Sequence, residues 1–282
     1  MLDLHMHSTF SDGSFPPEDL VAKAVEAGVT AISLTDHDTM AGVPRFLEAS
    51  RLNNLRVIPG VEISTDYKGR GMHILGYGMD IANKELQESL DWIRAGREAR
   101  NMEILEKLNR LGFVMTWEEV VARAGEDVVG RPHFCQTMID KGYVKDKTEA
   151  FDNWLGHGKP AYADRRRLDP EAGIRIIRKS GGVAVLAHPF TLNLTSTGLR
   201  ALLLELSRAG LEGIEAFYAE HKPDMQALYL SMAEEYGLLV TGGTDFHGAL
   251  TPMLRIGYGF GSLNVPDSLL EPLLARINER KP

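Results

Sequence analysis

Short apolar runs alternate with longer amphipathic segments over most of the chain. Runs of about four to eight residues rich in Val, Ile and Leu indicate buried strands, and a period of three to four residues indicates helices. The pattern predicts strands at 2–7, 31–35, 56–64, 71–77, 183–187, 213–217 and 238–241. It predicts helices at 17–27, 43–53, 170–179, 199–208, 225–236 and 267–279. Strands that alternate with helices favour a parallel α/β fold, and here a β/α barrel.

The alternation is interrupted in the middle of the chain. A long helical segment at 85–111 ends at Gly112, and Thr116 with Glu119 forms a capping-box pattern that opens another helix. Further helical segments are predicted at 134–140 and 148–155, without a strand between them. We therefore expect a small helical insert domain at 100–167, which divides a barrel formed by 1–99 and 168–282.

Composition narrows the class of protein. The 282 residues are 44% hydrophobic and 25% charged, as in ordinary globular proteins. A net charge of −8 argues against a protein that grips long nucleic acid through its phosphates. The single Cys135 excludes an internal disulfide, and no apolar run approaches the ~20 residues that span a bilayer. We expect a cytoplasmic protein without membrane contact.

Six histidines and three carboxylates lie at or just beyond the ends of predicted strands. They are His5, His7, Asp12, His37, Glu62, His73, His188, Asp245 and His247. The carboxyl ends of parallel barrel strands meet on one face, so these side chains should gather there. The spacing of two between His5 and His7, and between Asp245 and His247, places each pair on one strand face. Imidazoles and carboxylates without thiolates suit divalent cations, so the sequence predicts a multinuclear metal centre.

Each of these signals has an ordinary structural explanation when it stands alone. Asp12-Gly13 is typical of a turn, Asp36-His37-Asp38 of a capped strand end, and His188 of a hydrogen-bonded core histidine. Glu62 stands between two apolar residues, and an unpaired buried carboxylate is costly, so it needs a metal or an ion pair. The recurrence at four or five strands favours the metal centre.

The ordered motifs resemble the PHP (polymerase and histidinol phosphatase) superfamily. They are His5-x-His7, Asp12-Gly13, Asp36-His37-Asp38, Glu62, His73, His188-Pro189 and Asp245-x-His247. The resemblance covers the barrel from end to end, and all nine positions are present. It implies a distorted (β/α)7 barrel with a trinuclear metal centre.

The resemblance also implies three ligand sets and a catalytic role for all nine residues. The sets are His5, His7, Glu62 and Asp245; Glu62 as a bridge with His73 and His188; and Asp12, His37 and His247. We expect two to three divalent cations, Mn²⁺ first, with Fe²⁺, Zn²⁺ or Mg²⁺ as alternatives.

Two motifs of the insert resemble one branch of that superfamily. Gly130-Arg131-Pro132-His133-Phe134 and Gly158-Lys159-Pro160-Ala161-Tyr162 are similar to segments of enzymes that act on nucleoside 3′,5′-bisphosphates and short 5′-phosphorylated RNA. Arg131 offers a fork of donors that suits a phosphate. We expect Arg131, His133 and Lys159 to bind substrate. Alone, Arg131 is also typical of a solvated arginine at the start of a helix, and Lys159 of a lysine in a loop.

The expected activity is a metal-dependent phosphatase that releases the 3′-phosphate of a nucleoside 3′,5′-bisphosphate, for example adenosine 3′,5′-bisphosphate to AMP. A hydroxide held by the metals would attack the phosphate. The main alternative is a 5′–3′ exonuclease or phosphodiesterase on short 5′-phosphorylated RNA. An amidohydrolase, a histidinol-phosphatase-type enzyme and a metal-storing scaffold are weaker alternatives. The expected partners are a small nucleotide or a short RNA.

Overall fold

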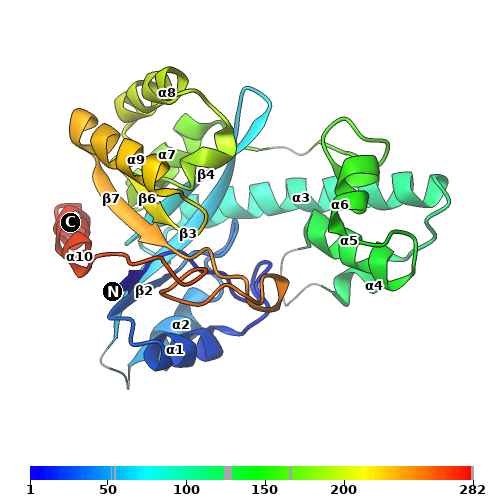
Figure 1. The fold of residues 1–282 in the computed structure, drawn as a ribbon, viewed down its shortest axis with the longest axis horizontal. Helices are drawn as coiled ribbons and strands as arrows, with labels where there is room; N and C mark the ends of the chain where they lie inside the picture. The colour runs from blue at the N-terminus through cyan, green and yellow to red at the C-terminus, as the bar shows by residue number, and fades with distance from the viewer. Residues whose placement is uncertain (52, 54, 124–128, 165–166, 281–282) are drawn as a thin grey trace.

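A seven-stranded sheet forms the centre of the molecule in the computed structural model, which describes residues 1–51, 53, 55–123, 129–164 and 167–280 (Figure 1). Its strands follow one another in chain order. They are β1 (Leu2–Asp3), β2 (Ala31–Leu34), β3 (Arg56–Tyr67), β4 (Arg70–Tyr77), β5 (Val183–Leu186), β6 (Gly213–Tyr218) and β7 (Leu239–Gly243). Beyond β1 and β7 the chain pairs Met6 with Phe246, and the His7 N–H donates to the Phe246 carbonyl at 2.9 Å. The first and last strands therefore meet and close a barrel.

Strand β4 departs from the parallel direction that the alternation of strands and helices predicts. It pairs antiparallel with both β3 and β5, whereas the other strand pairs are parallel. The reason is a tight turn at Lys68 and Gly69, which have φ of 54° and 80° and leave no room for a helix. The register sets His73 opposite Ser64, so His73 still lies at the same end of the barrel as Glu62.

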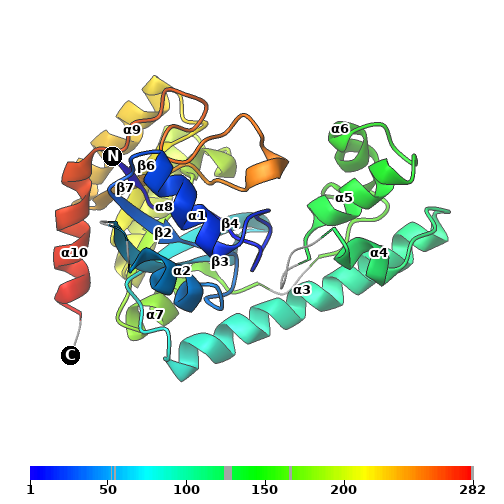
Figure 2. The same cartoon turned by 90° about the horizontal axis from the view of Figure 1, so that it is seen from below.

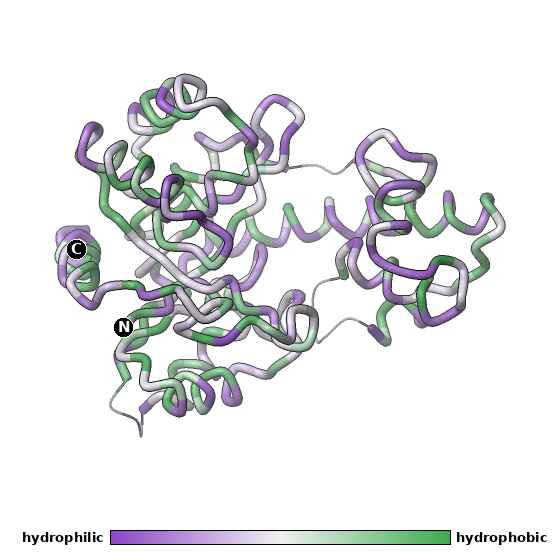
Figure 3. Tube along the Cα trace, viewed as in Figure 1, coloured by the Kyte–Doolittle hydropathy of each residue, from purple (hydrophilic) through white to green (hydrophobic). Residues whose placement is uncertain are grey.

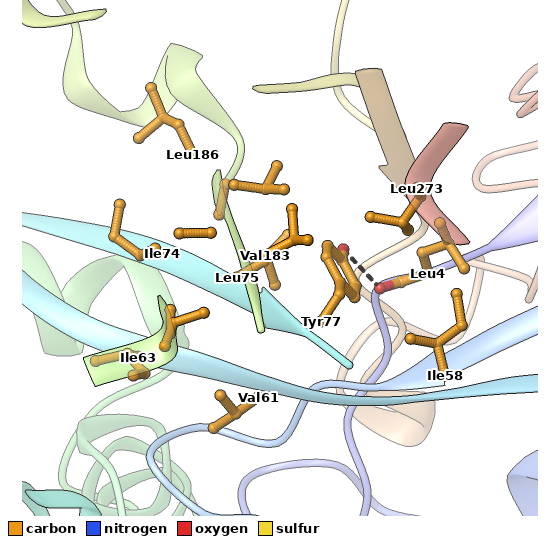
Figure 4. Close-up of a cluster of buried hydrophobic side chains, with 14 of the residues drawn as sticks. Leu4, Ile58, Val61, Ile63, Ile74, Leu75, Tyr77, Val183, Leu186 and Leu273 are labelled. Carbon is orange, nitrogen blue, oxygen red and sulfur yellow. Dashed lines mark hydrogen bonds between the residues drawn. The ribbon is translucent and has the colours of Figure 1, made fainter. Parts of the chain in front are cut away.

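Helices cover the outside of the barrel (Figures 1 and 2). They are α1 (Pro17–Glu26), α2 (Val43–Ser50), α7 (Pro170–Lys179), α8 (Ser196–Ala209), α9 (Pro223–Tyr236) and α10 (Leu270–Asn278), with the short 3₁₀ segments η2 (Pro189–Leu192), η3 (Gly248–Leu250) and η4 (Asp267–Leu269). Helix α7 begins as the sequence predicts, since the Asp169 carboxylate accepts from the Ala172 N–H at 2.7 Å and Pro170 occupies the first turn. The strands bury aliphatic side chains on both faces, among them Val61, Ile74 and Val183 (Figure 4).

Helix α3 (Lys84–Arg110) carries a group of shorter helices away from the barrel. Its 27 residues span about 40 Å, and hydrophobic and hydrophilic stretches alternate along it (Figure 3). Its far half packs against the following elements: α4 (Trp117–Val121), α5 (Arg131–Asp140), α6 (Lys147–Ala150) and the π-helical η1 (Phe151–Leu155). These elements share a core of their own around Leu108, Phe134 and Leu155. The domain boundaries at 100 and 167 stay a prediction.

The buried Tyr77 ties β4 to the first strand, because its hydroxyl donates to the Leu4 carbonyl at 3.0 Å (Figure 4). Tyr77→Phe should lower the free energy of unfolding by about 1–3 kcal/mol, since the Leu4 carbonyl would lose its donor in the core. Tyr258→Phe is the matched control, because its hydroxyl donates to the Ala27 carbonyl at 3.3 Å in an exposed position. Urea denaturation that gives equal losses for the two variants would contradict this account.

Candidate metal centre

The first ligand set converges on one side of the Glu62 carboxylate. The Nε2 atoms of His5 and His7 lie 3.3 and 3.2 Å from Glu62 Oε2. The same two atoms lie 3.2 and 2.9 Å from Asp245 Oδ1. The four ligand atoms of His5, His7, Glu62 and Asp245 fall within 4.8 Å of one another, which suits one cation.

The second set surrounds the other oxygen of Glu62. His73 Nδ1 and His188 Nε2 lie 2.8 and 2.9 Å from Oε1, and 3.4 Å from each other. His37 Nδ1 also approaches Glu62, at 3.1 Å from Oε2. His37, Glu62 and His73 therefore form a group as tight as the first. Glu62 contacts both groups, which fits the bridging position that the sequence predicts for it.

The third set centres on Asp12. His247 Nε2 lies 3.2 Å from Asp12 Oδ1, and His37 Nε2 lies 3.7 Å from Oδ2. His7 joins this group through Nδ1, which lies 3.7 Å from Asp12 Oδ1. His7, Asp12, His37 and His247 offer ligand atoms within 4.8 Å of one another. The structure thus brings together all nine residues, while their roles as ligands stay a prediction.

Two of the nine residues, His188 and Asp245, and the neighbouring Asp38 have strained backbone conformations. Asp38, His188 and Asp245 have φ of 57°, 23° and 56°, in a region that residues other than glycine rarely adopt. Each costs about 1–3 kcal/mol unless the surroundings impose it. His188 and Asp245 lie two residues after β5 and β7, and Asp38 lies four residues after β2, so the strain lies where the chain leaves the strands.

The unsatisfied polar atoms test whether the site suits metal ions. Five buried ligand atoms have no hydrogen-bond partner among the described residues: His5 Nε2, His7 Nε2, His37 Nδ1, Asp12 Oδ1 and Asp245 Oδ1. Buried polar atoms are almost always paired, and such a concentration of exceptions at one place needs an explanation. Divalent cations would satisfy all five, so the residues fit the group that the sequence predicts.

The charges in the cluster shift its pKa values in opposite directions. Burial lowers the pKa of His7, but the nearby carboxylates of Asp245 and Glu62 outweigh it and raise that pKa to about 10. Burial also acts on Glu62, yet the charges of the surrounding histidines hold its pKa well below the usual range. Burial dominates at His37 and lowers its pKa to about 3. Opposite charge, from bound cations or from protons on the histidines, is therefore needed to compensate the buried carboxylates.

Two residues that the sequence analysis did not single out, Glu215 and Tyr218, contact the cluster residues on the side away from its centre. Glu215 on β6 is fully buried; it lies 2.9 Å from His5 Nδ1 and accepts from the His188 backbone N–H at 2.7 Å. The Tyr218 hydroxyl donates to Asp245 Oδ2 at 2.9 Å, which leaves Oδ1 toward the cluster. Such outer partners orient ligands and set their tautomers. The sequence does hold a signal for Glu215, because this acidic residue lies inside an apolar strand, as Glu62 does.

The predicted substrate-binding residues of the insert fall in different places. Arg131 and His133 lie in the first turn of α5, and burial lowers the pKa of both. His133 Nδ1 accepts from the Gly130 N–H at 2.9 Å, and its nearest charges are Asp12 and Arg97. Lys159 is exposed on the turn after η1, and among the described residues its side chain shows no contact with the cluster.

Two cavities open on either side of the start of α5. One, of about 410 Å³, is lined by Asp12, Asp245 and His247 together with Pro132. The other, of about 580 Å³, is lined by Arg131 and by the basic residues Lys68, Arg70, His157 and Arg167. Helix α5 thus stands between a cavity floored by metal-site residues and a basic cavity.

Comparison with known proteins identifies the family. The model of the PHP domain matches residues 3–277, and the chain belongs to this family. A 5′-3′ exoribonuclease of Haemophilus influenzae is 35% identical over 87% of this chain and 89% of its own length. A 3′,5′-nucleoside bisphosphate phosphatase of Chromobacterium violaceum is 31% identical over 87% of each chain.

A solved structure from Bifidobacterium adolescentis, described as a candidate metal-dependent phosphoesterase, has a TM-score of 0.85 and 29% identity. It covers 98% of this chain and 96% of its own. The family, the barrel fold and the enzyme class predicted from the sequence, a metal-dependent phosphoesterase, are confirmed. In the described part of the chain, no helix is long and apolar enough to cross a membrane.

Glu62→Gln should lose bound metal and nearly all turnover, because the amide keeps the shape but removes the charge that two cations share. Glu212→Gln is the matched control, since Glu212 is also buried but pairs with Arg276 and Arg280 away from the cluster. Elemental analysis of both variants measures metal per chain. Wild-type metal content in Glu62→Gln would contradict the bridging role.

Metal affinity should fall on acidification. A cation must displace the proton that His7 holds up to its pKa of about 10, so affinity should rise with pH toward that value. Calorimetric titrations in buffers of different ionisation enthalpy should show net proton release at about pH 8. Binding heats that do not depend on the buffer would contradict the release of protons on metal binding.

Proposed function

We propose that the protein releases the 3′-phosphate of nucleoside 3′,5′-bisphosphates, with adenosine 3′,5′-bisphosphate hydrolysed to AMP. The observation that carries the proposal is the nine-residue cluster together with Arg131 on α5, the helix whose Pro132 lines the cavity beside the cluster. Arg131 is partly buried, and among the described residues it has no carboxylate ion pair; its recorded contacts are the Leu155 carbonyl and the rings of Phe151 and Tyr162. A partly buried guanidinium that has no carboxylate in ion-pair contact favours a phosphate.

The nine residues would hold two to three divalent cations, Mn²⁺ first and Fe²⁺, Zn²⁺ or Mg²⁺ otherwise. Such cations activate water for attack and neutralise charge on phosphoryl oxygens. Glu215 and Tyr218 hold His5 and Asp245 in position for them.

The insert at 100–167 would provide the grip on the second phosphate. Arg131 would hold the phosphate that does not react. His133 accepts at Nδ1 and, with its pKa lowered by burial, stays neutral, so its proton lies on Nε2 and can be donated to a phosphoryl oxygen. Lys159 would add charge at the rim of the insert. The single, buried Cys135 fits a cytoplasmic location.

Hydrolysis of short 5′-phosphorylated RNA is the second candidate, and the basic cavity favours it. Lys68 and Arg70 extend the positive charge beyond Arg131 along the β3–β4 hairpin, where a longer substrate would place further phosphates. Relatives of both kinds support keeping the two candidates together.

A panel of substrates tests the proposal. Phosphate release should be fastest from a nucleoside 3′,5′-bisphosphate, and slower from a 5′-mononucleotide, histidinol phosphate and a small artificial phosphate monoester. Faster release of mononucleotides from a short 5′-phosphorylated RNA would favour the second candidate. Hydrolysis of none of them by the metal-loaded protein would overturn both.

Arg131→Ala should separate substrate binding from chemistry. The loss of one charge-assisted contact of about 1.5–3 kcal/mol should reduce kcat/KM for the bisphosphate roughly 10- to 150-fold. The small monoester, which has no second phosphate, should be affected much less, and metal content should not change. An equal decrease for both substrates would place Arg131 on the reacting phosphate instead.

A further inference from the structure

The cavity of about 410 Å³ beside the metal centre has chemistry that phosphate binding does not use. Asp12, Asp245 and His247 line one part of it, so a group bound there touches the metal site. The residues Lys68, Arg70 and Arg167 line the other cavity. The two openings therefore differ: one is basic, and the other combines metal-site residues and one residue of each charge, Lys147 and Glu220, with an apolar surface.

Two apolar walls face this cavity. Helix α5 contributes Pro132, Cys135 and Ile139. The segment after β7 contributes Leu254 and Phe260. Phe260 is 53% exposed, so its ring does little for the core, while a planar ligand could cover it. Aromatic rings of this kind stack on nucleobases irrespective of their sequence.

Gln136 lines the same cavity, and its side-chain amide can form further hydrogen bonds. Its Nε2 donates one hydrogen to Asp140 Oδ1 at 2.8 Å. A primary amide has a second N–H and a carbonyl oxygen, and neither has a recorded partner among the described residues. A glutamine amide with both groups available matches the N6 and N7 edge of adenine.

We propose that this cavity binds the nucleobase of the substrate, with Phe260 as the stacking surface and Gln136 as the group that selects adenine. The inference rests on the proposed function in one respect: the phosphate bound at the metal centre belongs to a nucleotide. The base then lies between the ring of Phe260 and the apolar side of α5. Arg131 faces the opposite cavity, which leaves this one free for the base.

Equilibrium binding to the metal-loaded protein tests the proposal without relying on turnover. AMP and ribose 5-phosphate carry the same phosphate and sugar, but only AMP has a base. AMP should bind roughly 5- to 150-fold more tightly, the range that stacking of one base gives. Phe260→Ala should remove most of this ratio, and Phe260→Tyr should retain it.

Trp92→Ala is the matched control, because Trp92 on α3 is 44% exposed and does not line the cavity. It should leave the AMP to ribose 5-phosphate ratio at the wild-type value. Gln136→Leu should reduce the preference for AMP over inosine monophosphate, which lacks the exocyclic amine, roughly 5- to 150-fold. An unchanged preference would overturn the role of Gln136.

Equal binding of AMP and ribose 5-phosphate to the wild type, or an unchanged ratio in Phe260→Ala, would overturn the base site. Phosphate release measured on the same preparations keeps the two claims distinct. Base-dependent binding without any phosphate release would contradict the proposed function and support the base site. Phosphate release with equal binding of AMP and ribose 5-phosphate would support the proposed function and contradict the base site.

Discussion

The buried charge of Glu62 is the constraint on which the rest of the site depends. Its side chain is 1% exposed and lies within 3.3 Å of five imidazoles, from His5, His7, His37, His73 and His188. A carboxylate removed from water is destabilising unless opposite charge compensates it. Either protons on these histidines or bound cations must provide that charge, and the orphaned ligand atoms favour cations.

The barrel supplies the geometry that this constraint demands. Strands from distant parts of the sequence end at one mouth, and the antiparallel β4 brings His73 to the same place as Glu62 through its register. Residues with positive φ, Asp38, His188 and Asp245, lie where strands end. Glu215 and Tyr218 contact His5 and Asp245 through atoms that point away from the cluster and so orient their remaining atoms toward it.

Much of this could be predicted from the sequence, because strand periodicity places side chains on defined faces. The nine candidate positions followed from strand ends and from a family resemblance, and the structure brings these residues together. The direction of β4 could not follow from alternation, since a tight turn at Lys68 and Gly69 replaced a helix.

The supporting and substrate-facing groups were harder to predict, because they depend on contacts between distant segments. Glu215 meets His5 across 210 positions of sequence, so no local pattern reports the contact. Phe260 follows β7 and Gln136 lies on α5, so they reach one cavity only through a contact between segments that are distant in the sequence. The role of Lys159 stays a prediction that rests on a local motif, since its side chain is exposed in the structure.

The most direct measurement of the central claim is a metal titration of chelator-treated protein, with phosphate release from a nucleoside 3′,5′-bisphosphate followed at each step. The account predicts that the treated protein is inactive and that activity returns in proportion to bound metal, with saturation at two to three cations per chain. Full activity in protein shown by elemental analysis to hold no metal would contradict it.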